Sequence, residues 1–531
     1  MELHQQELWQ LLGLLTAVGA FVVLAPVARI PYPILLVLGG LGLSLVPGLP
    51  NFELPPEIVL LGFLPPLLYG AAFFTSLRDL RANVRPIGLL SIGLVVATTL
   101  VVGVVAHWAI DGLPWSAAFV LGAVVSPTDP IAATSIARRL GVPRRLVTII
   151  EGESLVNDAT ALVLYRAAVA AVLTGSFSLW EAGGRLVFNA AAGIAIGLAI
   201  GYVVRQVRRR MHDAPSEITI SLLTGYLAYL PAEALGVSAV LAAVTVGIYL
   251  GWYTPELTDP ETRLQGLAFW SILTFILNAA LFTLVGLQLP VVLDGLDAWS
   301  TAELAGAAAA VCAAVVVTRV LFVFPFMYLP KRVAQRISEP DSSPQWEWAA
   351  LLSWAGMRGA VSLAAALAIP LETDAGAPFP DRALIIFLAF CVIVFTLVVQ
   401  GLSLPFVIRV FGIEEDDLEA REEAKARLRA SEAALARLEE LTGEDWVRDD
   451  TAERTRGLYR FRSDRFAQRL DGTEGAVEEQ SQQYQRLRRE LLGAERDAVL
   501  ELRRAGVISD EVMERVLRDI ALEDVRLDHE R

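Results

Sequence analysis

Long apolar runs follow one another along most of this chain, and short polar segments separate them. A hydrocarbon core of about 30 Å is crossed by about 20 apolar residues of helix, and most of these runs approach or exceed that length. The pattern predicts an all-α polytopic membrane protein with about thirteen transmembrane helices. The predicted spans are 7–28, 31–48, 57–75, 86–109, 116–137, 147–174, 184–204, 217–234, 236–252, 264–289, 301–328, 346–370 and 382–411.

Basic residues gather in alternate loops between these spans. Those loops contain Arg29; Arg78, Arg81 and Arg85; Arg138, Arg139, Arg144 and Arg145; Arg205, Arg208, Arg209 and Arg210; Arg263; and Lys331, Arg332 and Arg336. The opposite loops hold acids such as Glu53 and Asp111, with Arg185 and Arg382 only at span edges. Because basic loops stay in the cytoplasm, we expect a multi-pass membrane protein with its N-terminus outside and its C-terminus inside.

The character of the chain changes after Phe411. The segment 413–531 is rich in Glu, Arg, Ala and Leu at helical spacing, and Ser509 is placed to cap a helix. It contains 32 acidic and 22 basic residues, which argues against binding to nucleic acid. We therefore expect a transmembrane domain over 1–412 and an acidic, helical cytosolic tail over 413–531 with a regulatory role.

Composition supports the membrane assignment. Hydrophobic residues make up 55% of the 531 positions, and the mean hydropathy is +0.52. The first apolar segment is long and lacks a basic region before it, so a cleaved signal peptide is not expected. The two cysteines, Cys312 and Cys391, lie within apolar runs, which argues against a disulfide framework or a cysteine metal site.

Predicted span five contains the sequence SPTDP, in which Pro127 and Pro130 flank Thr128 and Asp129. Proline removes a backbone donor and disfavours helix at the residue before it, so Ser126 and Asp129 should leave helical geometry. Broken backbone at membrane depth is tolerated where protein or a water-filled cavity surrounds it. The break is therefore a candidate site for a small ion, with a simple proline kink as the alternative.

Predicted span six contains GESLVND, which places acids in an apolar helix. Ser154 and Asp158 are four residues apart and share one face, and Glu153 and Asn157 share the next. A carboxylate at the bilayer centre costs about 3 kcal/mol, so it usually faces a partner or an aqueous path. Asp158 is accordingly a candidate functional group rather than only a buried structural acid.

Predicted span twelve is interrupted in a similar way. Gly356 and Gly359 surround Arg358, and span eleven contains a further arginine, Arg319. Two interrupted helices in related halves of a chain indicate a midplane binding site in secondary transporters. We expect Arg358 to form a buried salt bridge with Glu153, with Arg319 as the alternative partner.

SPTDP, GESLVNDATALVLY and WAGMRGAVSLAAALAIP together resemble the bacterial branch of the monovalent cation:proton antiporter-1 family, the Na+/H+ exchangers. The resemblance extends over all the predicted spans and to the end of the tail. It implies inverted repeats, a mobile core near 86–174 and 301–411, a scaffold formed by the other spans, and a homodimer. It also implies that Asp158 carries the proton or cation and that Ser154, Thr128 and Asp129 are cation ligands. Asn157 and the buried pair then have supporting roles.

One position departs from that family. Many relatives place an acid in span three that hydrogen-bonds the Asn of the Asn-Asp pair, whereas this chain has Gly70 in FLPPLLYGAAF. Asn157 must therefore find another partner.

These features predict electroneutral exchange of Na+, or of Li+ or K+, for H+ in pH and sodium homeostasis. One carrier carboxylate holds either a proton or a monovalent cation, and both compete for it. A K+-selective antiporter is the main alternative. A cation channel or sensor and an intramembrane aspartyl protease using Asp129 and Asp158 are further alternatives, although GxGD is absent and the polar groups form one cluster. We expect a transporter rather than an enzyme, with no cofactor, membrane lipid around it, and no protein partner besides its own copy.

Overall fold

The computed structural model describes residues 30–46, 55–174, 179–211, 213–296, 299–328, 346–374, 376–413, 418–472 and 476–528, together with 16, 19–21, 23 and 24. Most of the first predicted span lies outside the described residues, as does the loop with Lys331, Arg332 and Arg336. The chain divides into two compact units, Met1–Glu415 and Asp416–Arg531.

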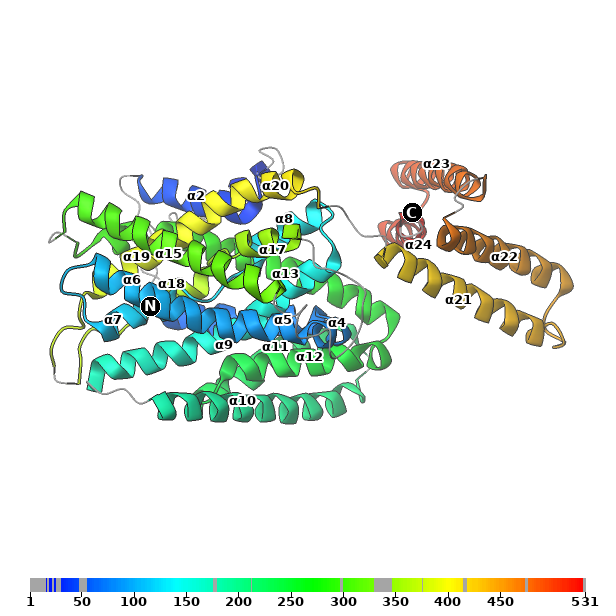
Figure 1. Ribbon diagram of the computed structural model, residues 1–531. Coiled ribbons are helices and arrows are strands. Elements are labelled where there is room, and N and C mark those ends of the chain that lie inside the picture. The colour runs from blue at the N-terminus through cyan, green and yellow to red at the C-terminus, as the bar shows by residue number, and fades with distance from the viewer. Residues whose placement is uncertain are drawn as a thin grey trace. The chain divides into compact units, whose positions relative to one another are not determined.

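Helices form the first unit (Figure 1). Within the described ranges, the only extended pairing is a single antiparallel bridge between Glu372 and Pro378, which confirms the all-helical fold class. The helices are α2 (Tyr32–Ser44), α3 (Leu64–Phe74), α4 (Leu77–Ala82), α5 (Val84–Gly88), α6 (Val95–Ala109), α7 (Trp115–Val124), α8 (Pro130–Arg139), α9 (Arg144–Thr174), α10 (Leu179–Arg208), α11 (Ala214–Ala234), α12 (Ala239–Leu257), α13 (Pro260–Leu287), α14 (Leu289–Leu293), α15 (Thr301–Tyr328), α17 (Trp346–Trp354), α18 (Ala360–Leu367), α19 (Arg382–Phe395) and α20 (Gly401–Val410), with π-helical turns at Ile58–Phe63, Leu89–Leu94 and Thr396–Gln400.

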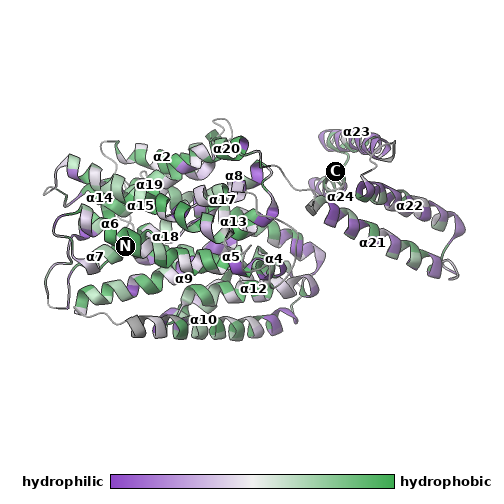
Figure 2. Ribbon diagram, viewed as in Figure 1, coloured by the Kyte–Doolittle hydropathy of each residue, from purple (hydrophilic) through white to green (hydrophobic). Residues whose placement is uncertain are grey.

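Many of these helices are long and apolar enough to cross a membrane. In the described part of the chain, six continuous helical segments meet that requirement: Val84–Ala109, Arg144–Thr174, Gly183–Arg208, Pro260–Leu293, Thr301–Phe326 and Arg382–Val410. Shorter apolar helices lie at Tyr32–Ser44, Ile58–Phe74 and Trp115–Val124. Figure 2 shows the contrast with the second unit, whose helices are mostly hydrophilic.

The helices of the first unit pack in two sets. In one set, α2 packs on α13, α3 packs on α11 and α12, and α10 packs on α12. In the other, α6 packs on α7 and α15, α7 packs on α9, and α15 packs on α17. The α2–α13 contact is so close at Gly286 that an added Cβ would overlap the carbonyl oxygen of Val37. Small residues allow such backbone approach between membrane helices.

Two predicted spans are broken in the middle. Span five forms α7 and α8, with non-helical backbone over 126–129 between them. As predicted from the prolines, Ser126 is non-helical, and Asp129 has φ −98° and ψ 123° before Pro130 begins α8. Span twelve likewise forms α17 and α18, which are separated by non-helical residues 356–359.

The second unit is built from four described helices, α21 (Leu418–Leu441), α22 (Asp449–Asp471), α23 (Ala476–Arg504) and α24 (Asp510–Asp528). Helix α21 packs on α22 and α23 packs on α24. Ser509 caps α24, because its Oγ accepts a hydrogen bond from the Val512 N–H at 3.3 Å, as the sequence predicts.

One ion cluster joins two helices of this unit. Glu478, at the start of α23, accepts hydrogen bonds from Arg465 and Arg469 of α22 at 2.8 and 2.9 Å. These hydrogen bonds, led by that from Arg465, lower the pKa of Glu478 from its ordinary 4.5 to about 2. The cluster therefore connects α22 to α23 as long as Glu478 is ionised.

Candidate functional site

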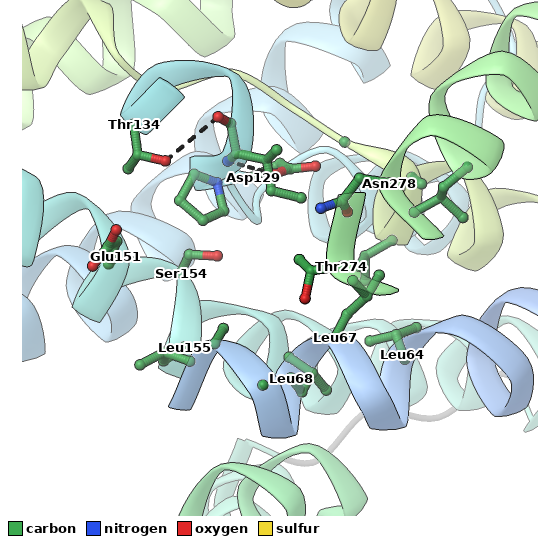
Figure 3. Close-up of a pocket in the computed structure, with 18 of the residues that line it drawn as sticks. Leu64, Leu67, Leu68, Asp129, Thr134, Glu151, Ser154, Leu155, Thr274 and Asn278 are labelled. Carbon is green, nitrogen blue, oxygen red and sulfur yellow. Dashed lines mark hydrogen bonds between the residues drawn. The ribbon is translucent and has the colours of Figure 1, made fainter. Parts of the chain in front are cut away.

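A cavity of about 590 Å³ lies inside the first unit, where the two helix sets meet. Its walls come from α2, the π-helical turn at Ile58–Phe63, α3, α8, α9, α13, α18 and the break between α7 and α8. Apolar side chains form much of the wall, and Figure 3 shows several polar ones among them. The polar residues that line it include Thr128, Asp129, Thr134, Ser154, Asp158, Thr274 and Asn278.

The two helix breaks meet at Asp129. Its backbone N–H donates to the carbonyl oxygen of Met357 at 2.8 Å, so the break in span five hydrogen-bonds to the break in span twelve. Its Oδ1 accepts from the Ile131 N–H at 2.9 Å and caps α8. A Cβ at Gly359 would collide with the Asp129 carboxylate, so this crossing requires glycine there. Asp129 therefore has a structural role in addition to lining the cavity.

Asp158 and Ser154 lie on the cavity side of α9, as their four-residue spacing predicts. Their side chains are buried, with 6% and 8% of each residue exposed. In the part of the chain that the structure describes, neither side chain has a recorded hydrogen bond or ion pair with protein. Two oxygen-bearing groups on one helix face are thus available to a small ligand in the cavity.

Asn157 is fully buried behind this face, and the structure supplies its partner. Its Nδ2 donates to the Thr128 Oγ1 at 2.7 Å and to the Thr128 carbonyl oxygen at 3.3 Å. The Thr128 hydroxyl in turn donates to Glu153 Oε1 at 2.9 Å. This chain of hydrogen bonds ties the break in span five to α9, and it occupies most of the Thr128 hydroxyl's bonding capacity.

The predicted salt bridge between Glu153 and Arg358 is wrong, and the alternative partner, Arg319, is the one that the structure shows. Glu153 binds Arg319 of α15 instead, with Oε1 to Nη1 at 2.6 Å and Oε2 to Nη2 at 2.9 Å. The Arg319 Nε donates to the carbonyl oxygen of Leu352 at 2.9 Å, which satisfies the last turn of α17. Both side chains are about 2% exposed. Arg319 can approach α17 because Gly356 has no Cβ; a Cβ added there would overlap the guanidinium.

Arg358 is fully buried, yet its guanidinium has no hydrogen-bond partner among the described residues. Only its backbone is fixed here, since its N–H donates to Thr396 Oγ1 at 3.0 Å. Glu153, Asn157, Arg319 and Arg358 do not line the cavity, so the candidate residues separate into a lining set and a supporting set behind it.

Trp270 occupies the space beside Gly70. A Cβ built at Gly70 would lie 3.0 and 3.1 Å from two ring carbons of Trp270. The Trp270 Nε1 donates to Ser221 Oγ at 3.2 Å, and the Tyr69 hydroxyl lies 3.1 Å from the same oxygen. An indole held by these hydrogen bonds therefore stands where relatives are expected to place an acid.

Sequence reasoning missed the polar residues of the facing wall. Tyr32, Thr274 and Asn278 line the cavity from α2 and α13. The signal was present, because Ser271, Thr274 and Asn278 fall at i, i+3 and i+7 of an apolar span and so share one face. The spacing alone did not show that this polar face lines a cavity, because that depends on which helices pack against α13.

The cavity extends from Asp158 in one direction only. In α9, which is described throughout, the lining residues are Glu151, Ser154, Leu155 and Asp158, and none follows Asp158. Glu151 pairs with Arg138 at 2.6 Å at this end, close to the arginine-rich segment 138–145. The cavity therefore opens toward the loops that carry the basic residues.

Comparisons with known proteins agree with this arrangement. The family model described as "Sodium/hydrogen exchanger, transmembrane" matches residues 13–410. An uncharacterized Na+/H+ exchanger of Mycobacterium tuberculosis is 39% identical over 525 residues, covering 97% of this chain and 95% of its own. A sodium, potassium, lithium and rubidium/H+ antiporter of Bacillus subtilis is 36% identical over 389 residues, covering 71% of this chain and 58% of its own.

A solved structure shows the same fold. The sodium proton antiporter of Methanocaldococcus jannaschii, at pH 8, matches with a TM-score of 0.58 and 19% identity, covering 76% of this chain and 99% of its own. The family model spans most of the chain, and the mycobacterial relative aligns over nearly its whole length. This chain is a member of the sodium/hydrogen exchanger family of cation:proton antiporters.

Proposed function

We propose that this protein exchanges one monovalent cation, Na+ in the first place, for one H+ across a bacterial inner membrane. Asp158 binds the proton and the cation in turn, and Ser154, Thr128 and Asp129 contribute oxygens around it. The exchange serves pH and sodium homeostasis. Family membership supports cation:proton antiport, and the residue roles and the stoichiometry rest on the geometry of the site.

The observation that carries this proposal is the state of the Asp158 carboxylate. It is buried, lines the cavity, and has no recorded hydrogen bond or ion pair with any described residue. A buried charge is costly unless a partner compensates it. Such a carboxylate is stable with a proton or with a bound cation, and a group that alternates between the two is an exchanger.

Electroneutrality follows from the number of free carboxylates. Asp129 also lines the cavity, but its Oδ1 caps α8 and its backbone belongs to the helix crossing. Glu153 is neutralised by Arg319. Asp158 is thus the carboxylate left to alternate between proton and cation, while Asp129 contributes an oxygen without changing its charge. One alternating carboxylate balances one monovalent charge in either direction of transport.

The donor set favours a hard monovalent cation. Carboxylate, hydroxyl and carbonyl oxygens are ligands of hard cations, and they suit Na+, Li+ and K+ alike. The Bacillus subtilis relative is named for sodium, potassium, lithium and rubidium. We place Na+ first because most of the names among the similar proteins specify it, and K+-selective exchange is the second candidate.

Transport by alternating access requires one body to move against another. We assign the core to the spans near 86–174 and 301–411 and the scaffold to the remaining spans, in a bundle of thirteen. With the basic loops in the cytoplasm, the cavity faces inward and the N-terminus lies outside. A homodimer formed through the scaffold keeps the scaffold fixed in the lipid while the core moves. The acidic tail from residue 413 modulates the rate or the pH dependence of exchange.

The proposal is tested by reconstituting the protein in sealed liposomes with a pH-sensitive dye inside. Adding Na+, Li+ or K+ should in turn drive proton movement, and a potential-sensitive dye should remain silent. A channel would move cations without coupling them to protons, and an aspartyl protease would do neither. Proton movement that generates a membrane potential would overturn the one-for-one stoichiometry.

A further inference from the structure

The cavity wall formed by α13 contains a buried amide whose carbonyl oxygen has no hydrogen-bond partner among the described residues. Asn278 lies in the middle of α13, is 2% exposed, and lines the cavity. Its side-chain carbonyl, Oδ1, has no hydrogen-bond partner among the described residues. Buried polar atoms are nearly always satisfied, so an orphaned acceptor beside a cavity indicates that the cavity's contents satisfy it.

Its neighbours show where this carbonyl lies. The Asn278 side chain hydrogen-bonds to Tyr32, and both residues line the cavity together with Asp129. Figure 3 shows Asn278 and Thr274 on α13 facing Asp129 and Ser154 across one space. The amide therefore faces the same small volume as the proposed cation ligands, from the other side.

The helix that carries Asn278 belongs to the opposite helix set. Helix α13 packs mainly on α2, with further contacts to α11 and α3, whereas Asp158 and Ser154 belong to α9, which packs on α7. Under the proposed alternating access, the α9 ligands move with the core and Asn278 stays with the scaffold. A cation can therefore contact the α9 ligands and Asn278 at the same time only while the cavity faces the basic loops.

We propose that Asn278 is a cation ligand used only in this inward-facing state, where its side-chain carbonyl binds the monovalent cation as it enters or leaves the Asp158 site. The inference rests on the proposed function, and it assigns one cation ligand to the cytoplasmic side of the transport cycle. An amide carbonyl is a neutral, hard oxygen ligand of the kind that suits Na+ or Li+. Because it stays behind when the core moves, it lowers the KM for the cation on the cytoplasmic face and leaves the KM on the outer face unchanged.

The test compares everted membrane vesicles, whose cytoplasmic face is outward, with right-side-out vesicles. The variants are Asn278→Leu, which keeps the approximate volume and removes the carbonyl, and Ile276→Ala, a control on the exposed face of α13 that does not line the cavity. In everted vesicles, Asn278→Leu should raise the KM for Na+ and for Li+ about tenfold or more, the loss of one contact to a charged group, with little change in maximal rate. In right-side-out vesicles its KM should equal that of the wild type, and Ile276→Ala should behave as wild type in both.

A second variant keeps the test decisive if Asn278→Leu does not fold. Asn278→Asp retains an oxygen at this position and adds charge, so it should lower the KM for Na+ in everted vesicles only. An unchanged KM in everted vesicles, or a KM altered equally on both faces, would overturn the inference. A wild-type protein inactive in both vesicle types would instead overturn the proposed function itself.

Discussion

The chemistry proposed here depends on one side chain, Asp158, and its replacement gives the most direct prediction. Asp158→Asn retains the size of the side chain and removes the titratable group. Exchange should fall to the background of empty liposomes while the elution profile of the purified protein stays the same. Dye measurements of proton flux driven by Na+ check this, and transport clearly above background would mean that another group carries the proton.

The two buried arginines should differ in their importance for stability. Arg319 makes two hydrogen bonds to Glu153 and one to Leu352, whereas the Arg358 guanidinium makes none with the described residues. Breaking a buried pair costs about 3–5 kcal/mol, because one charge is left uncompensated. Arg319→Ala should therefore lower the thermal midpoint in detergent far more than Arg358→Ala.

The reverse order of the two midpoints would restore the pairing expected from the sequence. A useful check is the double variant Glu153→Ala/Arg319→Ala, which removes both charges together. It should recover part of the stability that Arg319→Ala loses, because contacting residues are not additive.

The local conformation and the helix face of a site residue could be predicted from the sequence. The residue that it contacts from another helix could not. The prolines around Asp129 and the spacing of Ser154 and Asp158 are local features, and the structure places these residues as expected. The partner of Glu153 depends on how α15 packs against α17, which no local spacing encodes. For the same reason, the sequence showed that Asn157 lacked the acid of span three but did not identify Thr128 as its partner.

At the scale of elements, the crossing of the two broken helices should be intolerant of a single methyl group. Gly359→Ala would place a Cβ against the Asp129 carboxylate and displace the break that hydrogen-bonds to Met357. We expect lost exchange and a lowered thermal midpoint.

Gly306→Ala is the matched control, since that glycine lies in α15 with nothing within 4 Å of its added Cβ. Alanine is favoured over glycine in a helix by about 1 kcal/mol, so this variant should be neutral or slightly stabilising. Equal behaviour of the two variants would show that the crossing adapts.

The connection between α22 and α23 should depend on pH. The folded-state pKa of Glu478 is about 2, below its ordinary 4.5, so the carboxylate stabilises the folded tail. This contribution is complete above about pH 4.5 and is lost as the pH falls toward 2. Hydrogen exchange in α22 and α23 of the full chain, corrected for the intrinsic rate, should rise over that window.

Glu478→Gln removes the charge at every pH, so it should show faster exchange already at pH 7. It should also show a smaller change between pH 5 and pH 3 than the wild type, within the window set by the Glu478 pKa. If the variant and the wild type have the same pH dependence, other carboxylates control the tail.

Helices were the best-predicted elements, because hydrophobic runs and breakers are read along the chain. The structure places the boundary between predicted spans eight and nine at the end of α11, with Gly236 at φ +70° before Ser238 caps α12. The pairing of α2 with α13 depends on close backbone contact at distant glycines, and it could not be predicted from either segment alone.

For the whole molecule, we predict that exchange does not require the tail. The cavity and all its lining residues lie between Tyr32 and Ser362, within the first compact unit. A chain truncated near Gly412 should fold, dimerise and exchange, with a shifted pH profile or rate. Cross-linking and liposome assays check this, and a folded, dimeric truncation with no exchange at any pH would place the tail within the mechanism.

Trp270 beside Gly70 limits which side chains position 70 can accept. A Cβ at position 70 would lie 3.0 and 3.1 Å from two ring carbons of Trp270, so the ring has to shift by a few tenths of an ångström before an acid fits there. Replacing Trp270 by a smaller residue removes the hydrogen bond that its Nε1 donates to Ser221 and leaves the one between Tyr69 and Ser221 in place. The two positions are therefore energetically coupled, and an acid at position 70 should be tolerated better with a smaller residue at position 270 than with the tryptophan.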